Sequence, residues 1–83
     1  MESKNWQINN NRLEKEWKFP DFKTAVEFIN RVAAKAKQLN HHPDISLHDY
    51  KFLKISLFSH DQNKITDKDY RLARMIDDIK IEE

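Results

Sequence analysis

Histidine is the residue type in this sequence best suited to chemistry near neutral pH. His41 and His42 are adjacent and precede Pro43, and His60 stands further along the chain. An unperturbed imidazole has a pKa of about 6.5, so it can give or take a proton at physiological pH. Two or three histidines that converge would therefore be able to move protons on a small substrate. His48, the fourth histidine, has no evident partner.

Two other interpretations of these residues stay open at this point. A His–His pair at the end of a helix is commonly a solvated cap, and Asp69 in the first turn of a helix would stabilise it by roughly 0.3–1 kcal/mol through the helix dipole. A metal site made of the paired histidines, His60 and Asp69 is less favoured, because adjacent histidines in an extended pair diverge and no His-x-x-x-His spacing exists. No Ser–His–Asp arrangement is readable, since Ser59 and His60 on a strand would point to opposite faces.

Composition excludes several other classes of chemistry. The 83 residues include no cysteine and no glycine, which excludes disulfides, thiolate catalysis and glycine-rich phosphate loops. Without glycine, any residue with positive φ should be Asn or Asp. Fifteen Lys and Arg nearly cancel fourteen Asp and Glu, and a net charge of +1 argues against nucleic-acid or membrane partners. The chain has no signal peptide and no apolar run of the ~18 residues that a membrane span needs, so we expect a cytoplasmic protein.

The first half of the chain predicts two short strands and a long helix. Residues 5–19 alternate loosely around Asn9–Asn11, which predicts two strands joined by an Asn-rich turn. The period then changes, and the pattern predicts a helix over 22–39 with Asp21 as its N-cap and Asn40 as its C-terminal cap. The expected buried stripe is Phe22, Ala25, Val26, Ile29, Val32, Ala33, Ala36 and Leu39.

The second half predicts a hairpin and a second helix. Residues 45–60 return to a period of two, with a turn expected near residues 49–51. Thr66 is expected to open the last helix, whose stripe is Leu72, Ala73, Ile76 and Ile79. The order predicts a single α+β domain over 1–83 with two layers, a four-stranded antiparallel sheet and two helices on one face (ββαββα). Apolar residues on the other sheet face suggest an oligomer.

The spacing of the candidate residues resembles the pterin-4a-carbinolamine dehydratase family, also called dimerisation cofactor of a homeodomain transcription factor. The pattern is Lys37-x-x-x-His41-His42-Pro43, then Tyr50 after six residues, His60 after nine and Asp69 after eight. Surrounding segments are similar too, and the resemblance runs from about Trp6 to Ile79. Two departures are a missing N-terminal helix, usual in the family, and Asn63 in a loop where the family usually has glycine. We expect Asn63 to provide the positive φ there.

The resemblance implies a dehydratase that needs no metal and no cofactor, with a pterin as its substrate. The substrate would be 4a-hydroxytetrahydrobiopterin, which loses water from C4a and a proton from a ring nitrogen to give quinonoid dihydropterin. By position, His41, His42 and His60 correspond to the family's active-site histidines. His41 and His60 would share the acid and base roles, while His42 binds and orients the pterin. Pro43 would fix the backbone of the pair, and Asp69 would orient a histidine or bind the pterin.

The same resemblance implies partners and one alternative function. The chain would be a homodimer or homotetramer and would act in tetrahydropterin recycling beside an aromatic amino-acid hydroxylase. The alternative is a non-catalytic dimerisation or binding scaffold for a protein partner. The three histidines favour the enzyme, because a scaffold has no need of them.

Overall fold

Two hairpins with left-handed turn residues make up most of the sheet. The first joins β2 (Gln7–Asn9) to β3 (Arg12–Lys18). The turn residues Asn10 and Asn11 have φ values of 52° and 62°, and two successive positive φ values suit the right-handed twist of a tight hairpin. Asn adopts this conformation at low cost, so the predicted Asn-rich turn is confirmed.

The second hairpin joins β4 (Asp44–His48) to β5 (Phe52–Leu57), also as predicted. Its turn uses positive φ at Asp49 (48°) and at Tyr50 (55°). The expectation that only Asn or Asp would adopt positive φ is therefore wrong at Tyr50. The twist of the paired strands requires left-handed geometry at that point of the turn, whatever residue stands there.

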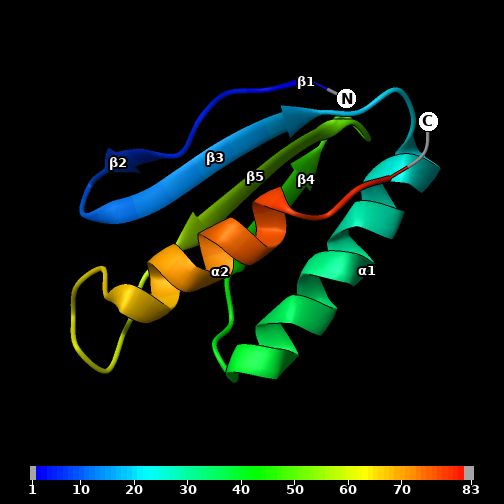
Figure 1. Ribbon diagram of the computed structural model, residues 1–83. Coiled ribbons are helices and arrows are strands. Elements are labelled where there is room, and N and C mark those ends of the chain that lie inside the picture. The colour runs from blue at the N-terminus through cyan, green and yellow to red at the C-terminus, as the bar shows by residue number, and fades with distance from the viewer. Residues whose placement is uncertain (1, 82–83) are drawn as a thin grey trace.

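The computed structural model describes residues 2–81 and arranges them in two layers (Figure 1). Met1, Glu82 and Glu83, which the predicted domain includes, lie outside the described residues. The short strand β1 (Glu2–Ser3) and β2 pair with successive parts of β3, so the order across the sheet is β1 or β2, β3, β5, β4. All pairings are antiparallel and the sheet is four strands wide, which confirms the predicted α+β class.

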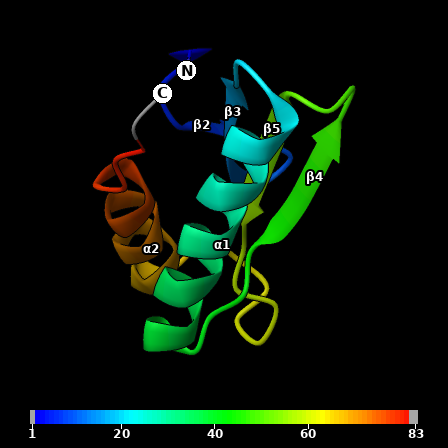
Figure 2. The same ribbon diagram turned by 90° about the vertical axis from the view of Figure 1, so that its right-hand side faces the viewer.

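Helices α1 (Phe22–Leu39) and α2 (Asp67–Asp77) cover one face of the sheet (Figure 2). The caps of α1 are those predicted: the Asp21 side chain accepts a hydrogen bond from the Thr24 N–H at 2.8 Å, and Asn40 ends the helix with a φ of 50°. Neither helix in residues 2–81 has the length and apolarity needed to cross a membrane.

The buried face of α1 is narrower than the predicted stripe. It consists of Ala25, Phe28, Val32 and Ala36. Phe22, which was expected to pack, is 56% exposed, and Ala33 is exposed as well. Phe28 occupies the central position instead, with its ring 5.2 Å from that of Trp17 and 5.3 Å from that of Phe19. The face centred on Phe28 leaves Phe22 and Ala33 at its margins.

The core lies between the inner sheet face and the two helices. Leu53, Ile55 and Leu57 of β5 point into it, and the intervening residues of β5 are only half-buried on the outer face. Three residues of the stripe predicted for the second helix lie in α2 and are buried: Leu72, Ala73 and Ile76. Ile79 is buried too, but it follows the helix, which ends at Asp77. Ser59, the next inward position after Leu57, is also buried. The inner face of β5 therefore continues past the end of the strand to a polar residue.

Candidate functional site

His41 and Asp69 meet at the end of the core where α1 finishes and α2 begins. His41 directly follows the left-handed cap Asn40, and its N–H donates to the Ala36 carbonyl at 3.0 Å. Asp69 is the third residue of α2. The distance from His41 Nε2 to Asp69 Oδ1 is 2.5 Å, although 28 positions separate the two residues. The Asp69 side chain is fully buried and that of His41 is 12% exposed.

The second oxygen of the Asp69 carboxylate is also hydrogen-bonded. Its Oδ2 accepts the backbone N–H of Thr66 and the hydroxyl of Ser59, each at 2.8 Å. Thr66 is the N-cap of α2, so the first contact is half of a capping box. Because an ionised carboxylate only accepts, we assign the His41 Nε2–H as the donor to Asp69, which in a neutral imidazole leaves the lone pair on Nδ1. This arrangement holds an imidazole in the tautomer that can take up a proton.

Ser59 and Thr66 are functional candidates that the sequence did not reveal. No Ser–His–Asp arrangement was readable, yet the structure joins Ser59, Asp69 and His41 in that order, with the carboxylate in the middle. The available signal was the period of two in β5, which places Ser59 on the same inward face as Leu57. The partner of an inward serine depends on where α2 docks, which the period does not indicate.

The other predicted site residues stand apart from this network. His60 is exposed, and its ring packs edge-on against Phe58 with 5.2 Å between ring centroids. His42 is exposed and Pro43 is half-buried. Within residues 2–81, no hydrogen bond or ion pair joins His42 or His60 to another side chain. His48 lies at the far end of β4 from His42, where its ring stacks on Phe52.

A pocket of about 370 Å³ opens beside the network. Ser59 and Thr66 belong to its lining, together with Asp61, Gln62, Asp67 and Lys68. The pocket is therefore bounded by the loop that follows His60 and by the first turn of α2. In the part of the chain that the structure describes, no three His, Asp or Glu side chains are close enough to share a metal ion.

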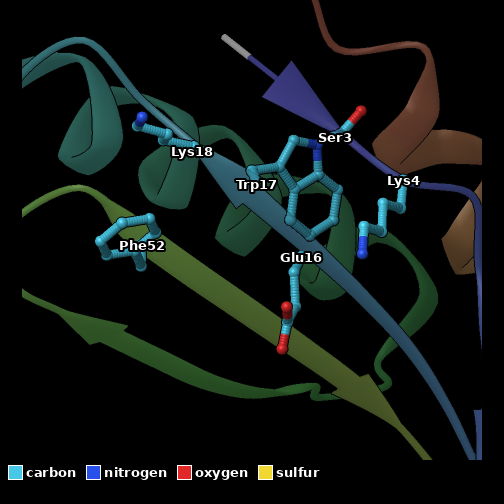
Figure 3. A pocket seen from close by; sticks show the side chains of 6 residues that line it. All are labelled: Ser3, Lys4, Glu16, Trp17, Lys18 and Phe52. Atoms are coloured by element: carbon cyan, nitrogen blue, oxygen red, sulfur yellow. The ribbon is translucent and has the colours of Figure 1, made fainter.

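A second pocket of about 370 Å³ lies elsewhere, along β1 and β3 (Figure 3). Neither pocket is lined by a predicted site residue, and the lining of the second is Ser3, Lys4, Glu16, Trp17, Lys18 and Phe52. This lining contains no histidine, the residue type best suited to proton transfer near neutral pH. The groups suited to proton transfer lie at the His41–Asp69 end, which is where we place the candidate active site.

Comparison with known protein sequences gives a consistent result. The profile of the family described as "Pterin 4 alpha carbinolamine dehydratase" matches residues 1–79. A protein of Sulfurisphaera tokodaii, named "Putative pterin-4-alpha-carbinolamine dehydratase", is 42% identical over 76 residues, which are 92% of this chain and 81% of the relative. A protein of the same name from Synechococcus sp. is 42% identical over 72 residues, or 87% of this chain and 76% of the relative.

Solved structures agree with the fold. A transcriptional coactivator/pterin dehydratase from Brucella melitensis superposes with a TM-score of 0.82 at 30% identity, covering 90% of this chain and 81% of that one. A pterin dehydratase-like protein described as a RuBisCO assembly factor in the alpha-carboxysome superposes with a TM-score of 0.73 at 18% identity, covering 89% and 87%. The second likeness concerns the fold alone. Since the family profile spans nearly the whole sequence and relatives match over most of their length, the chain belongs to the pterin-4-alpha-carbinolamine dehydratase family.

Proposed function

We propose that this chain dehydrates 4a-hydroxytetrahydrobiopterin to quinonoid dihydropterin by histidine acid–base catalysis. The observation that carries the proposal is the His41–Asp69 pair, in which a fully buried carboxylate holds one imidazole nitrogen at 2.5 Å. A histidine held this way is a suitable general acid or base, because its orientation and tautomer are fixed before the substrate arrives. Family membership supplies the substrate class.

The reaction needs two proton transfers, one to the substrate and one from it. The C4a–oxygen bond breaks as the hydroxyl receives a proton and leaves as water. A ring N–H loses its proton, and its electron pair forms the carbon–nitrogen double bond of the quinonoid product. One proton is taken up and one is released, so the reaction consumes no net acid or base.

We assign these transfers to His41 and His60. His41 has an Nδ1 lone pair once Nε2–H donates to Asp69. His60 is exposed, on the loop that begins after the inward-facing Ser59. His42, which is also exposed, would bind and orient the pterin, and Pro43 would restrict the backbone that carries it. Asp69 acts on His41 rather than on the pterin, because its carboxylate is fully buried and both of its oxygens already have partners.

A direct assay tests the proposal. Purified protein is mixed with freshly generated 4a-hydroxytetrahydropterin in the presence of a chelator, and the quinonoid product is followed by absorbance against the spontaneous rate. We expect acceleration that survives the chelator and falls by roughly 10²-fold or more in His41→Ala and in His60→Ala. His48→Ala is the matched control, since His48 is an exposed histidine at the far end of β4, and it should keep full activity.

The alternative function is a binding scaffold for a protein partner. It is favoured by the similar protein from Brucella melitensis, which is described as a transcriptional coactivator/pterin dehydratase. Folded protein that gives no acceleration in the assay would favour this alternative. Loss of acceleration in His48→Ala as well as in His60→Ala would count against the assigned residues instead.

The proposal includes the setting of the reaction. The enzyme would work in tetrahydropterin recycling in the cytoplasm, taking the hydroxylated pterin that an aromatic amino-acid hydroxylase releases. The absence of cysteine fits a reducing compartment. A homodimer or homotetramer is part of the proposal, and sedimentation equilibrium of the purified chain tests it.

A further inference from the structure

Ser59 carries a buried hydroxyl to which the acid–base assignment gives no role. The residue is 2% exposed, although it lies beyond the last residue of β5 and next to the exposed His60. A buried hydroxyl normally costs stability unless its donor and acceptor are used. The contacts of Ser59 Oγ therefore indicate what the residue does.

The hydrogens around Ser59 can be assigned by counting donors. Ser59 Oγ lies 2.8 Å from Asp69 Oδ2, which only accepts, so the single hydroxyl hydrogen of Ser59 points there. Thr66 Oγ1 lies 2.7 Å from Ser59 Oγ and must donate to it. The distance from Thr66 Oγ1 to Asp69 Oδ2 is 3.5 Å, too long to compete. The result is a directed chain from Thr66 to Ser59 to the Asp69 carboxylate.

This chain determines which oxygen of Asp69 faces the histidine. Oδ2 is occupied by two donors, the Ser59 hydroxyl and the Thr66 backbone N–H. Rotation of the carboxylate would break both bonds, so Oδ1 alone is presented to His41 Nε2. Removal of the Ser59 hydroxyl would leave a single anchor on Oδ2 and would let the carboxylate turn.

The backbone of Ser59 is held as firmly as its side chain. Its N–H donates to the Lys64 carbonyl at 3.1 Å, and its carbonyl accepts the N–H groups of Lys64 and Gln62 at 3.3 and 3.2 Å. These bonds close the loop that begins with His60, and Asn63 adopts a φ of 55° within it, as expected from the sequence. Ser59 thus belongs both to the loop that carries His60 and to the network that holds His41.

We propose that Ser59 is a positioning residue, whose hydroxyl locks the Asp69 carboxylate so that it holds His41 in its proton-accepting tautomer. The proposal rests on the proposed function for its effect on turnover, but the lock itself is a property of the folded chain. Ser59 does not touch the imidazole, and it acts through Asp69.

The test compares three substitutions by two readouts. Ser59→Ala removes the hydroxyl, Ser59→Thr keeps it, and Ser56→Ala is the matched control. Ser56 Oγ is also buried, but it has no hydrogen-bond partner among residues 2–81. The first readout is turnover per folded molecule in the dehydration assay. The second is exchange with water of the His41 ring N–H, observed by NMR in ¹⁵N-labelled protein and assigned by its loss in His41→Ala.

For Ser59→Ala we expect turnover about tenfold lower and exchange of the His41 ring N–H about tenfold faster, as the loss of one hydrogen bond of ordinary strength predicts. Ser59→Thr and Ser56→Ala should stay close to the unmodified chain in both readouts. The proposal is overturned if Ser59→Ala matches Ser56→Ala in its exchange rate, or if Ser59→Thr fails to restore what Ser59→Ala loses.

The two readouts separate this proposal from the proposed function. If the unmodified chain does not dehydrate the pterin, the proposed function fails, and the exchange rates alone decide whether Ser59 locks the Asp69–His41 contact. If the chain is active but exchange is unchanged in Ser59→Ala, the function stands and the positioning role is wrong.

Discussion

Helix α2 carries carboxylates near both ends, and two of them, Asp69 and Asp77, have different surroundings. Asp69, in the first turn, is fully buried and is bound by a hydroxyl, a backbone N–H and an imidazole. Asp77, the last residue of the helix, has a side chain that is 41% exposed. Its Oδ1 accepts from Lys15 Nζ at 2.8 Å and from Trp6 Nε1 at 3.0 Å.

The difference shows how one side-chain type serves two purposes on one helix. Asp77 is paired with a permanent cation, and it ties the segment before β2 and the strand β3 to α2. Asp69 faces a histidine, a residue type that can act as a proton donor or acceptor. Neutral donors satisfy the remaining oxygen of Asp69, so its charge is held without a competing cation. The pairing partner thus distinguishes a structural contact from a candidate catalytic one.

The sharpest test of this comparison is the same substitution at both carboxylates. Asp69→Asn replaces one carboxylate oxygen with an NH₂ group, which cannot accept a hydrogen bond. Depending on how the amide is oriented, the variant loses either the acceptor for Ser59 and Thr66 or the acceptor for His41 Nε2. We expect turnover of the hydroxylated pterin to fall by roughly 10²-fold or more. Asp77→Asn should leave turnover unchanged. Equal activity of the two variants would show that burial and a histidine partner do not mark the functional carboxylate.

The free energy of unfolding should also distinguish Asp69 from Asp77. Asp69→Ala leaves the Thr66 N–H and the Ser59 hydroxyl buried without their acceptor. We expect the free energy of unfolding to fall by about 3 kcal/mol, measured by urea denaturation. A loss as small as that expected for an exposed pair would mean that water reaches the two donors in the variant.

Asp77→Ala should have a smaller effect on the same measurement. The exposed ion pair with Lys15 and the contact with the Trp6 indole should together contribute about 1 kcal/mol. Because salt screens exposed pairs, the difference from the unmodified chain should shrink as the salt concentration rises. A difference that is independent of salt would point to lost packing of Trp6 rather than to a lost charge pair.

A third carboxylate, Asp21, extends the comparison to a fully exposed group. The backbone N–H of Thr24, and then its hydroxyl, lower the pKa of the Asp21 carboxyl from its ordinary value of 3.8. Because the folded-state pKa is the lower one, the ionised cap stabilises the protein above about pH 4 and ceases to do so as the pH falls through the folded pKa. Asp21→Ala should therefore lower Tm at neutral pH without changing turnover.

The pH dependence of Tm in Asp21→Ala tests whether the cap acts through its charge. The Tm difference between Asp21→Ala and the unmodified chain should be constant at neutral pH and should disappear under acid conditions. A difference that persists at the lowest pH would show that the cap acts through its shape and not through its charge.

Most of the fold was predictable because it depends on short-range rules. The bounds of α1, its caps Asp21 and Asn40, and the Asn10–Asn11 turn follow from residues within a few positions of each other. The misplaced details were those that depend on neighbours in space. Phe22 is exposed because Phe28 packs against Trp17 and Phe19, and these contacts join the helix to a strand.

In the candidate site, too, some features depend on neighbours in sequence and others on neighbours in space. Residue type and period are local properties, so they place histidines and a helix-capping acid at the ends of elements without any knowledge of the fold. The packing of the elements is what brings Asp69 to His41 rather than to His42 or His60, and what adds Ser59 and Thr66 to the network. The physical reason is that hydrogen bonds require atoms within about 3 Å, and that proximity arises where α1, β5 and α2 pack together.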